Sequence, residues 1–205
     1  MENHAPAGSP WSSSLSGLAG LAAALGLGYL ALSQRLPAPT VQQRERFGAP
    51  PMLAPCTMDR DGYFTGRIFA STAVDIDWSG NALTCAGNAR PDGQGLRLFF
   101  AGQLGESDDR LVLVLGIAAG VADLAGREHP VSLTLIDEAS SQFFHSQPDR
   151  CFTRIREVTP LGGGHEAFRV EGDLYCAGAI ASVTGSNSVT LGDMAFAGRL
   201  TLDGG

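Results

Sequence analysis

The segment from Cys151 to Cys176, CFTRIREVTPLGGGHEAFRVEGDLYC, constrains the fold more than any other part of the chain. If Gly162–His165 forms the loop of an antiparallel hairpin, Leu161 lies opposite Glu166, and Cys151 lies opposite Cys176. Directly opposite residues have Cβ atoms roughly 4.5–5.5 Å apart, so a small adjustment is enough to form a disulfide. The register therefore predicts a Cys151–Cys176 disulfide, with two buried free thiols as the alternative.

The same register sorts the side chains of the hairpin into two faces. Two opposite-charge pairs, Arg154 with Asp173 and Arg156 with Glu171, fall on one face. Glu157 departs from the pattern because it falls on the apolar face. The alternation predicts a half-buried hairpin. The apolar face comprises Thr153, Ile155, Phe168, Val170 and Leu174.

The chain around this hairpin also has the pattern of strands separated by turns. Even positions from Phe64 to Trp78 are mostly apolar, which predicts one long strand with a bend or bulge near residues 70–73. Leu83 and Cys85 then share the core phase of the next strand, and no convincing amphipathic helix follows. We therefore predict an all-β domain, an antiparallel β-sandwich or partly open barrel, over residues 58–205. Further strands are predicted at residues 95–102, 110–118, 130–138 and 193–202.

The N-terminal part of the chain is predicted to lie outside this domain. After a polar leader at 1–14, the segment 15–34 begins with LSGLAGLAAALGLGYLAL, which is uncharged and long enough to cross a bilayer as a helix. We interpret it as a transmembrane anchor, with a cleaved secretory signal peptide as the alternative. Residues 35–57 are rich in proline and polar side chains, which is typical of a tether.

Charge and cysteine content indicate the compartment. The net charge of -7 argues against a nucleic-acid partner, and the 14 basic residues are all arginine, as in a GC-rich bacterial genome. With Cys151 and Cys176 paired, Cys56 and Cys85 are expected to form a second disulfide. Disulfides favour an oxidising compartment, although Arg35 and other arginines after the apolar segment would favour a cytoplasmic domain. We give more weight to the cysteines, which predicts a bacterial inner-membrane protein, single-pass, with its C-terminal domain in the periplasm.

No segment of the chain has the pattern of an active site, a cofactor site or a metal site. Asp75 and Asp77 share the outer face of a predicted strand, which a solvated sheet explains as well as acid–base chemistry does. The run from Asp59 to Tyr63 resembles the start of a calcium loop but lacks a distal Glu. The histidines in the predicted loops, His145 among them, lack ligand spacing. We therefore expect no cofactor and no bound metal.

Two aromatic pairs, Phe99–Phe100 and Phe143–Phe144, are candidates for an interface. Only one ring of each pair can face the core of a sheet, so the other is available to a partner. The leading hypothesis is a non-enzymatic, membrane-tethered extracytoplasmic module that binds another membrane or periplasmic protein, or acts as an accessory subunit of a membrane complex. The alternative is a protein that binds a small molecule, lipid or carbohydrate in an apolar pocket. A third reading is a hydrolase with residues such as Asp75, Asp77 and His145 brought together from loops.

Overall fold

The domain is built of β-strands with almost no helix, which confirms the all-β prediction. Among the residues that it describes, a computed structural model shows twelve antiparallel strands and two single turns of 3₁₀-helix. In the part of the chain that it describes, no helix is long and apolar enough to span a membrane. The predicted leader and the anchor at 15–34 lie outside that part. The described residues are 55–58, 60, 62–105, 109–147, 149–162 and 166–202.

The strands follow one another with short connections. The 3₁₀ turns are η1 (Gly80–Ala82) and η2 (Val121–Asp123). The strands are β1 (Tyr63–Phe69), β2 (Ala73–Ser79), β3 (Thr84–Ala89), β4 (Leu96–Gln103), β5 (Arg110–Ile117), β6 (Glu128–Asp137), β7 (Gln142–His145), β8 (Cys151–Leu161), β9 (Glu166–Cys176), β10 (Ile180–Ala181), β11 (Ser188–Leu191) and β12 (Met194–Leu202).

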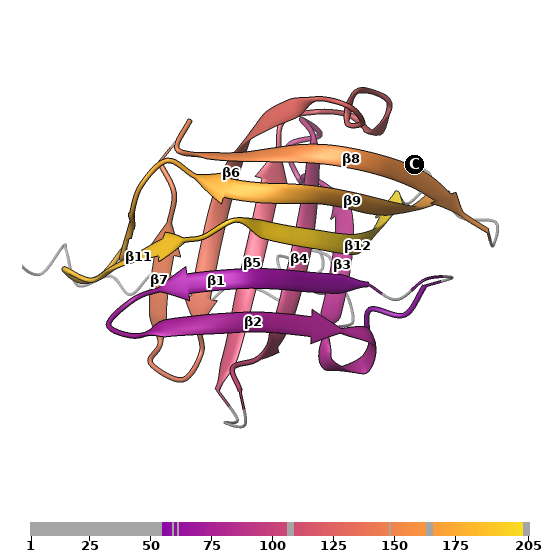
Figure 1. Cartoon of the computed structure of the whole chain (residues 1–205). Coiled ribbons are helices and arrows are strands. Elements are labelled where there is room, and N and C mark those ends of the chain that lie inside the picture. The colour runs from indigo at the N-terminus through magenta and orange to yellow at the C-terminus, as the bar shows by residue number, and fades with distance from the viewer. Residues whose placement is uncertain are drawn as a thin grey trace, which may run out of the picture. The chain divides into compact units, whose positions relative to one another are not determined.

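One continuous sheet folds over itself to make two layers. The strand order is β10-β11-β1-β12-β9-β8-β6-β5-β4-β3, with β2 paired to β1 and β7 paired to β6. The front layer of β8, β9, β12, β1 and β2 runs across the rear layer of β3 to β6 (Figure 1). The corner between the layers is β6, whose first residues pair with β8 and whose later residues pair with β5 and β7.

The core lies between these layers and centres on aromatic rings. Phe100 from the rear layer lies 4.9 Å from Phe64 and 5.3 Å from Phe196, measured between ring centroids. All three rings are fully buried. Gly198 allows the close approach, because a Cβ at that position would lie 2.6 Å from the ring of Phe100. A residue larger than glycine there would push the two layers apart.

The expected long strand over residues 64–78 is instead the β1–β2 hairpin. Ile68 pairs with Val74 and Phe69 pairs with Ala73, so residues 70–72 form the turn. A three-residue turn pairs even positions with even positions. The even positions therefore face the same side on both strands, and the apolar residues continue at even positions after the turn. Period-two alternation cannot distinguish such a hairpin from one bent strand, which is why the sequence-based prediction was wrong at this point.

The predicted hairpin register holds from the cysteine end up to a β-bulge. Cys151 is paired with Cys176 and Arg154 with Asp173, as predicted, but the register shifts between Ile155 and Glu157. Beyond the bulge, Leu161 lies opposite Ala167, so the predicted pairing of Leu161 with Glu166 is wrong. The extra residue lets Arg156 and Glu157 both face solvent, which removes the predicted burial of Glu157 on the apolar face.

Both predicted disulfides are present, and none of the four cysteines is free. The Cys56–Cys85 bond ties the segment before β1 to β3, where the amide of Cys56 also donates a hydrogen bond to the carbonyl of Leu83 at 2.7 Å. Cys151 and Cys176 join β8 to β9 as directly opposite residues. The two bonds are consistent with an oxidising, extracytoplasmic compartment.

Candidate functional site

The best-formed candidate site is a pocket of about 590 Å³ at one end of the domain. It lies where the β1–β2 turn, the β4–β5 connection, the β6–β7 turn and the start of β11 come together. This volume is within the range of roughly 300–1,000 Å³ that is typical of small-molecule sites. Its lining residues are Ile68, Ala70, Ser71, Thr72, Val74, Leu104, Leu111, Leu135, Asp137, Ser140, Gln142, Phe144, Asn187, Ser188 and Val189.

The floor of the pocket is apolar and is continuous with the core. It is formed by Ile68, Leu111, Leu135, Phe144 and Val189, all buried with relative exposure of 6% or less. These side chains point inward from strands of both layers, because each occupies the core phase of its strand. An apolar group that entered the pocket would therefore contact hydrocarbon rather than water.

The rim of the pocket is polar and is held in place by hydrogen bonds. Asp137 Oδ1 accepts bonds from the amides of Ala139 (3.1 Å) and Ser140 (3.2 Å), and Ser140 Oγ donates to Asp137 Oδ2 at 2.6 Å. This Asx turn sets the shape of the β6–β7 connection. Across the mouth, Asn187 Nδ2 donates to Gln142 Oε1 at 3.2 Å. The rim groups are thus positioned before any ligand binds.

Short strands complete the wall of the pocket. Phe144 of β7 forms an isolated bridge with Ser182, and the amide of Val183 donates to the carbonyl of Phe143 at 2.8 Å. Ile180 of β10 pairs in turn with β11, which pairs with β1. These contacts link the rear layer to the front layer beside the lining residues Phe144 and Val189.

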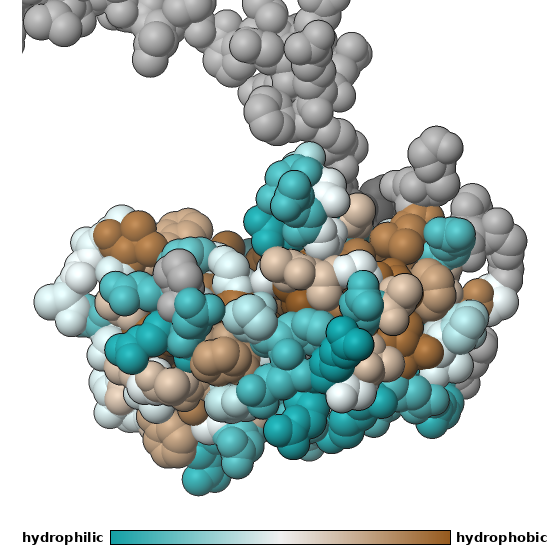
Figure 2. Space-filling view, turned by 90° about the horizontal axis from the view of Figure 1, so that it is seen from above, coloured by the Kyte–Doolittle hydropathy of each residue, from teal (hydrophilic) through white to brown (hydrophobic). Residues whose placement is uncertain are grey.

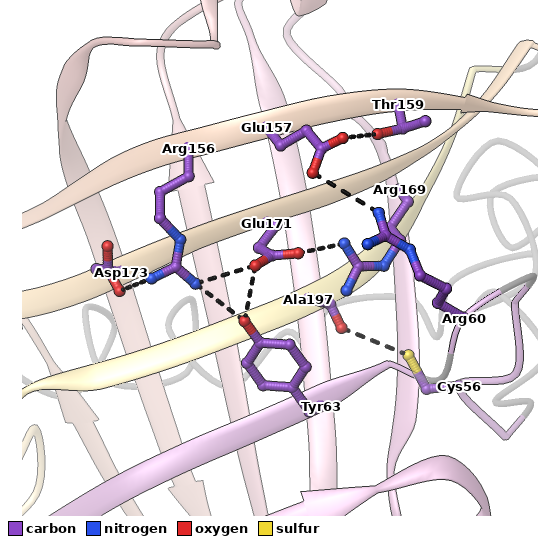
Figure 3. Close-up of polar contacts among 10 residues, drawn as sticks. All are labelled: Cys56, Arg60, Tyr63, Arg156, Glu157, Thr159, Arg169, Glu171, Asp173 and Ala197. Carbon is purple, nitrogen blue, oxygen red and sulfur yellow. Dashed lines mark hydrogen bonds and ion pairs between the residues drawn. The ribbon is translucent and has the colours of Figure 1, made fainter.

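A second polar feature, on the outer face of the front layer, is a cluster of charges around Arg169 (Figure 3). Arg169 is only 5% exposed, and its Nη1 donates to Glu171 Oε2. Tyr63 Oη donates to Glu171 Oε1 at 3.1 Å, and Arg156 donates to Asp173 (2.6 Å) and to Tyr63 Oη (2.9 Å). Arg169 Nε has no hydrogen-bond partner among the described residues. Seen from above, hydrophilic residues gather along the lower middle of the domain, with apolar residues beside them (Figure 2).

The cluster changes the acid–base properties of two of its members. Chiefly because it accepts a hydrogen bond from Arg169, the pKa of Glu171 is lowered from its ordinary value. Burial, and then the neighbouring Glu171, raise the pKa of Tyr63. Opposite charges thus compensate one another here, which is typical of a structural ion-pair network rather than of a group prepared for catalysis.

The segment before β1 packs beside the end of β12 and reaches one residue of this face. Cys56 Sγ lies 3.9 Å from the carbonyl oxygen of Ala197, a van der Waals contact because a disulfide sulfur has no proton to donate. Arg60 Nη2 lies 3.6 Å from Glu157 Oε2, an exposed pair of little energetic weight. A Cβ at Gly62 would lie 2.2 Å from Cys56 Sγ, so glycine is needed for this packing.

In each of the two predicted phenylalanine pairs, one ring faces the core and the other faces outward, as expected for neighbouring residues of a strand. Phe100 and Phe144 face the interior, and Phe144 also lines the pocket. Phe99 is half-buried, whereas Phe143 is 44% exposed. Of the four rings, Phe143 is thus the one most available to a partner.

The residues considered for hydrolysis are spread over two layers. Asp75 is held by Arg67 through hydrogen bonds of 2.5 and 2.8 Å on the outer face of the β1–β2 hairpin. Asp77 is exposed on the same strand. His145 belongs to β7, where its Nδ1 lies 3.0 Å from Thr134 Oγ1. The described residues include no group of three or more His, Cys, Asp or Glu arranged to hold a metal ion, and Asp59 and Asp61 lie outside them.

Sequence reasoning offered an apolar pocket as an alternative but did not locate it, because its rim comes from turns and from strands of two to four residues. Such strands, β7, β10 and β11, are too short to show period-two alternation. The fold and the pocket define an all-β, disulfide-bonded domain with an apolar site between its layers. The chain matches no protein-family model, and no curated protein or solved structure is significantly similar to it.

Proposed function

We propose that the domain is a non-enzymatic binding protein for a small apolar or amphipathic molecule. The observation that carries the proposal is the pocket of about 590 Å³ with a buried hydrocarbon floor and a prepared polar rim. In the same proposal, a β-sandwich faces the periplasm and is held at the bacterial inner membrane by residues 15–34. The apolar sequence of that segment and the two disulfides support this arrangement.

The energetics of the pocket favour an elongated apolar group. Transfer of one methylene from water to an apolar environment contributes about 0.8 kcal/mol, so a chain of several methylenes gains several kcal/mol before the costs of association. The polar rim then keeps the polar end of an amphipathic ligand hydrated or hydrogen-bonded at the mouth. Binding of this kind needs no catalytic group.

Filling the pocket should weaken binding of an apolar ligand. Val74 lines the pocket, whereas the adjacent Ala73 is exposed and points to the opposite face of β2. We expect Val74→Trp in the full chain to weaken binding of the neutral fluorophore N-phenyl-1-naphthylamine at least about tenfold, because the indole occupies the ligand's volume. Fluorescence titration measures this.

Ala73→Trp is the matched control, since it adds the same side chain one residue away and outside the pocket. It should bind the fluorophore as the wild type does. Equal binding by the wild type and by Val74→Trp would show that the fluorophore does not enter this pocket, and the proposal would fail.

A protein partner is the second candidate function, and it is favoured by an exposed apolar patch. Phe143 (44% exposed) and Val183 (65% exposed) lie side by side, joined by the backbone hydrogen bond between them. We expect affinity purification from intact membranes to recover a stoichiometric partner with the wild type and not with a Phe143→Ser/Val183→Ser variant. A clean monomer from wild-type membranes would count against this candidate.

A further inference from the structure

We infer that the pocket selects amphipathic ligands whose polar end is cationic or a hydrogen-bond donor, and that it discriminates against carboxylates and other anions. This inference rests on the proposed function, because it names the class of ligand that the same pocket takes. The observation that supports the inference is the position of one carboxylate, Asp137, at the rim of a pocket whose other lining residues are uncharged.

The lining contains no basic side chain to receive an anion. Among the described residues that line the pocket, Asp137 is the only one with a charge. Two basic residues, Arg67 and Arg110, directly precede the lining residues Ile68 and Leu111 in the chain. Because neighbouring residues of a strand point to opposite faces, both arginines lie on the outside. Arg67 is in addition paired with Asp75 there.

The carboxylate of Asp137 is not neutralised by any ion pair among the described residues. Its hydrogen-bond donors are the amides of Ala139 and Ser140 and the hydroxyl of Ser140, all neutral groups of its own turn. The same turn fixes the carboxylate beside the apolar floor, opposite Leu111 in the β5–β6 register. No basic side chain therefore compensates this carboxylate at the rim of the pocket.

The neighbouring rim groups add to this preference. Gln142 Oε1 is directed by the amide of Asn187 and, as a carbonyl oxygen, can accept a second hydrogen bond. An ammonium group at the mouth would find acceptors, whereas a carboxylate would be desolvated next to a like charge.

Three soluble ligands with the same apolar chain test the inference: hexylamine, hexanol and hexanoate. Each is titrated at pH 7 into the full chain, and binding is followed by the methyl NMR signals of the pocket residues Ile68, Leu111, Leu135 and Val189. We expect hexylammonium to bind about tenfold more tightly than hexanoate, with hexanol between them. Equal binding of the amine and the acid would overturn the inference and leave the proposed function intact.

Asp137→Asn identifies the source of the preference. The asparagine keeps an acceptor for the backbone amides of the turn but removes the charge. The affinity for hexylammonium should therefore exceed the affinity for hexanoate by only about threefold or less. Hexanol binding should not change. Asp77→Asn, which removes an exposed charge on the outer face of β2, is the matched control and should keep the wild-type ratio.

Two further outcomes are decisive. If none of the three ligands shifts the pocket methyls, the proposed function fails, and the inference fails with it. If Asp137→Asn does not fold, the wild type still supplies a test. Raising the salt concentration should bring the affinities for hexylammonium and hexanoate closer together, because salt screens charge interactions at an open mouth. A salt-independent ratio would overturn the inference.

Discussion

Phe100→Ala should lower the free energy of unfolding by about 4 kcal/mol, the usual cost of removing a fully buried phenylalanine ring. The ring is 0% exposed and joins the two layers, since it reaches from β4 in the rear layer to Phe64 and Phe196 in the front layer. The cavity left behind cannot close easily, because the strands around it are held by ladder hydrogen bonds on both sides. Urea denaturation monitored by circular dichroism measures the change.

Phe99→Ala provides the control for this prediction. It removes the same side chain from the adjacent residue of β4, but that ring is half-buried and lies on the other face of the strand. We expect a loss of less than about 1.5 kcal/mol, in proportion to the smaller buried area. Equal losses for Phe99→Ala and Phe100→Ala would contradict the assignment of Phe100 to the centre of the core.

Removal of the cross-strand disulfide by Cys151→Ala/Cys176→Ala should cost about 3.5 kcal/mol, from the loss of the loop closure that the bond imposes on the unfolded chain. The two cysteines are 25 residues apart in sequence, and Cys151 is fully buried. Alanine avoids burying a hydroxyl group, which serine would do. Differential scanning calorimetry of the oxidised proteins measures the loss.

The β8–β9 ladder is long enough to keep its register without the bond, so the variant should fold to the same structure with lower stability. Unchanged amide hydrogen exchange within β8 and β9, at denaturant concentrations well below the midpoint, would support this. A loss below about 1 kcal/mol would show that the unfolded chain is already constrained at this point, and would contradict the loop-closure account.

The hairpin shows how far the sequence alone can be taken. Its alternation and its cysteines predict the paired strands and the disulfide, and both are confirmed. The bulge near Arg156 was not predicted, because one inserted residue leaves most of the alternation on each side intact. The misplacement of Glu157 on the apolar face was the one sign of it in the sequence. The β1–β2 turn was missed for a related reason, since an odd number of turn residues preserves the phase.

Strand character and the all-β class could be derived from the sequence, because they depend on local periodicity. The Cys151–Cys176 pair followed from the register of neighbouring strands, and the Cys56–Cys85 pair followed because these were the two cysteines left. The tertiary structure alone decided how the sheet folds into two layers, that Arg169 is buried, and that a pocket opens beside Asp137. These features depend on contacts between residues far apart in the chain, such as Gln142 with Asn187 and Phe100 with Gly198. Local pattern carries no information about such pairs, because the same alternation is compatible with many arrangements of strands.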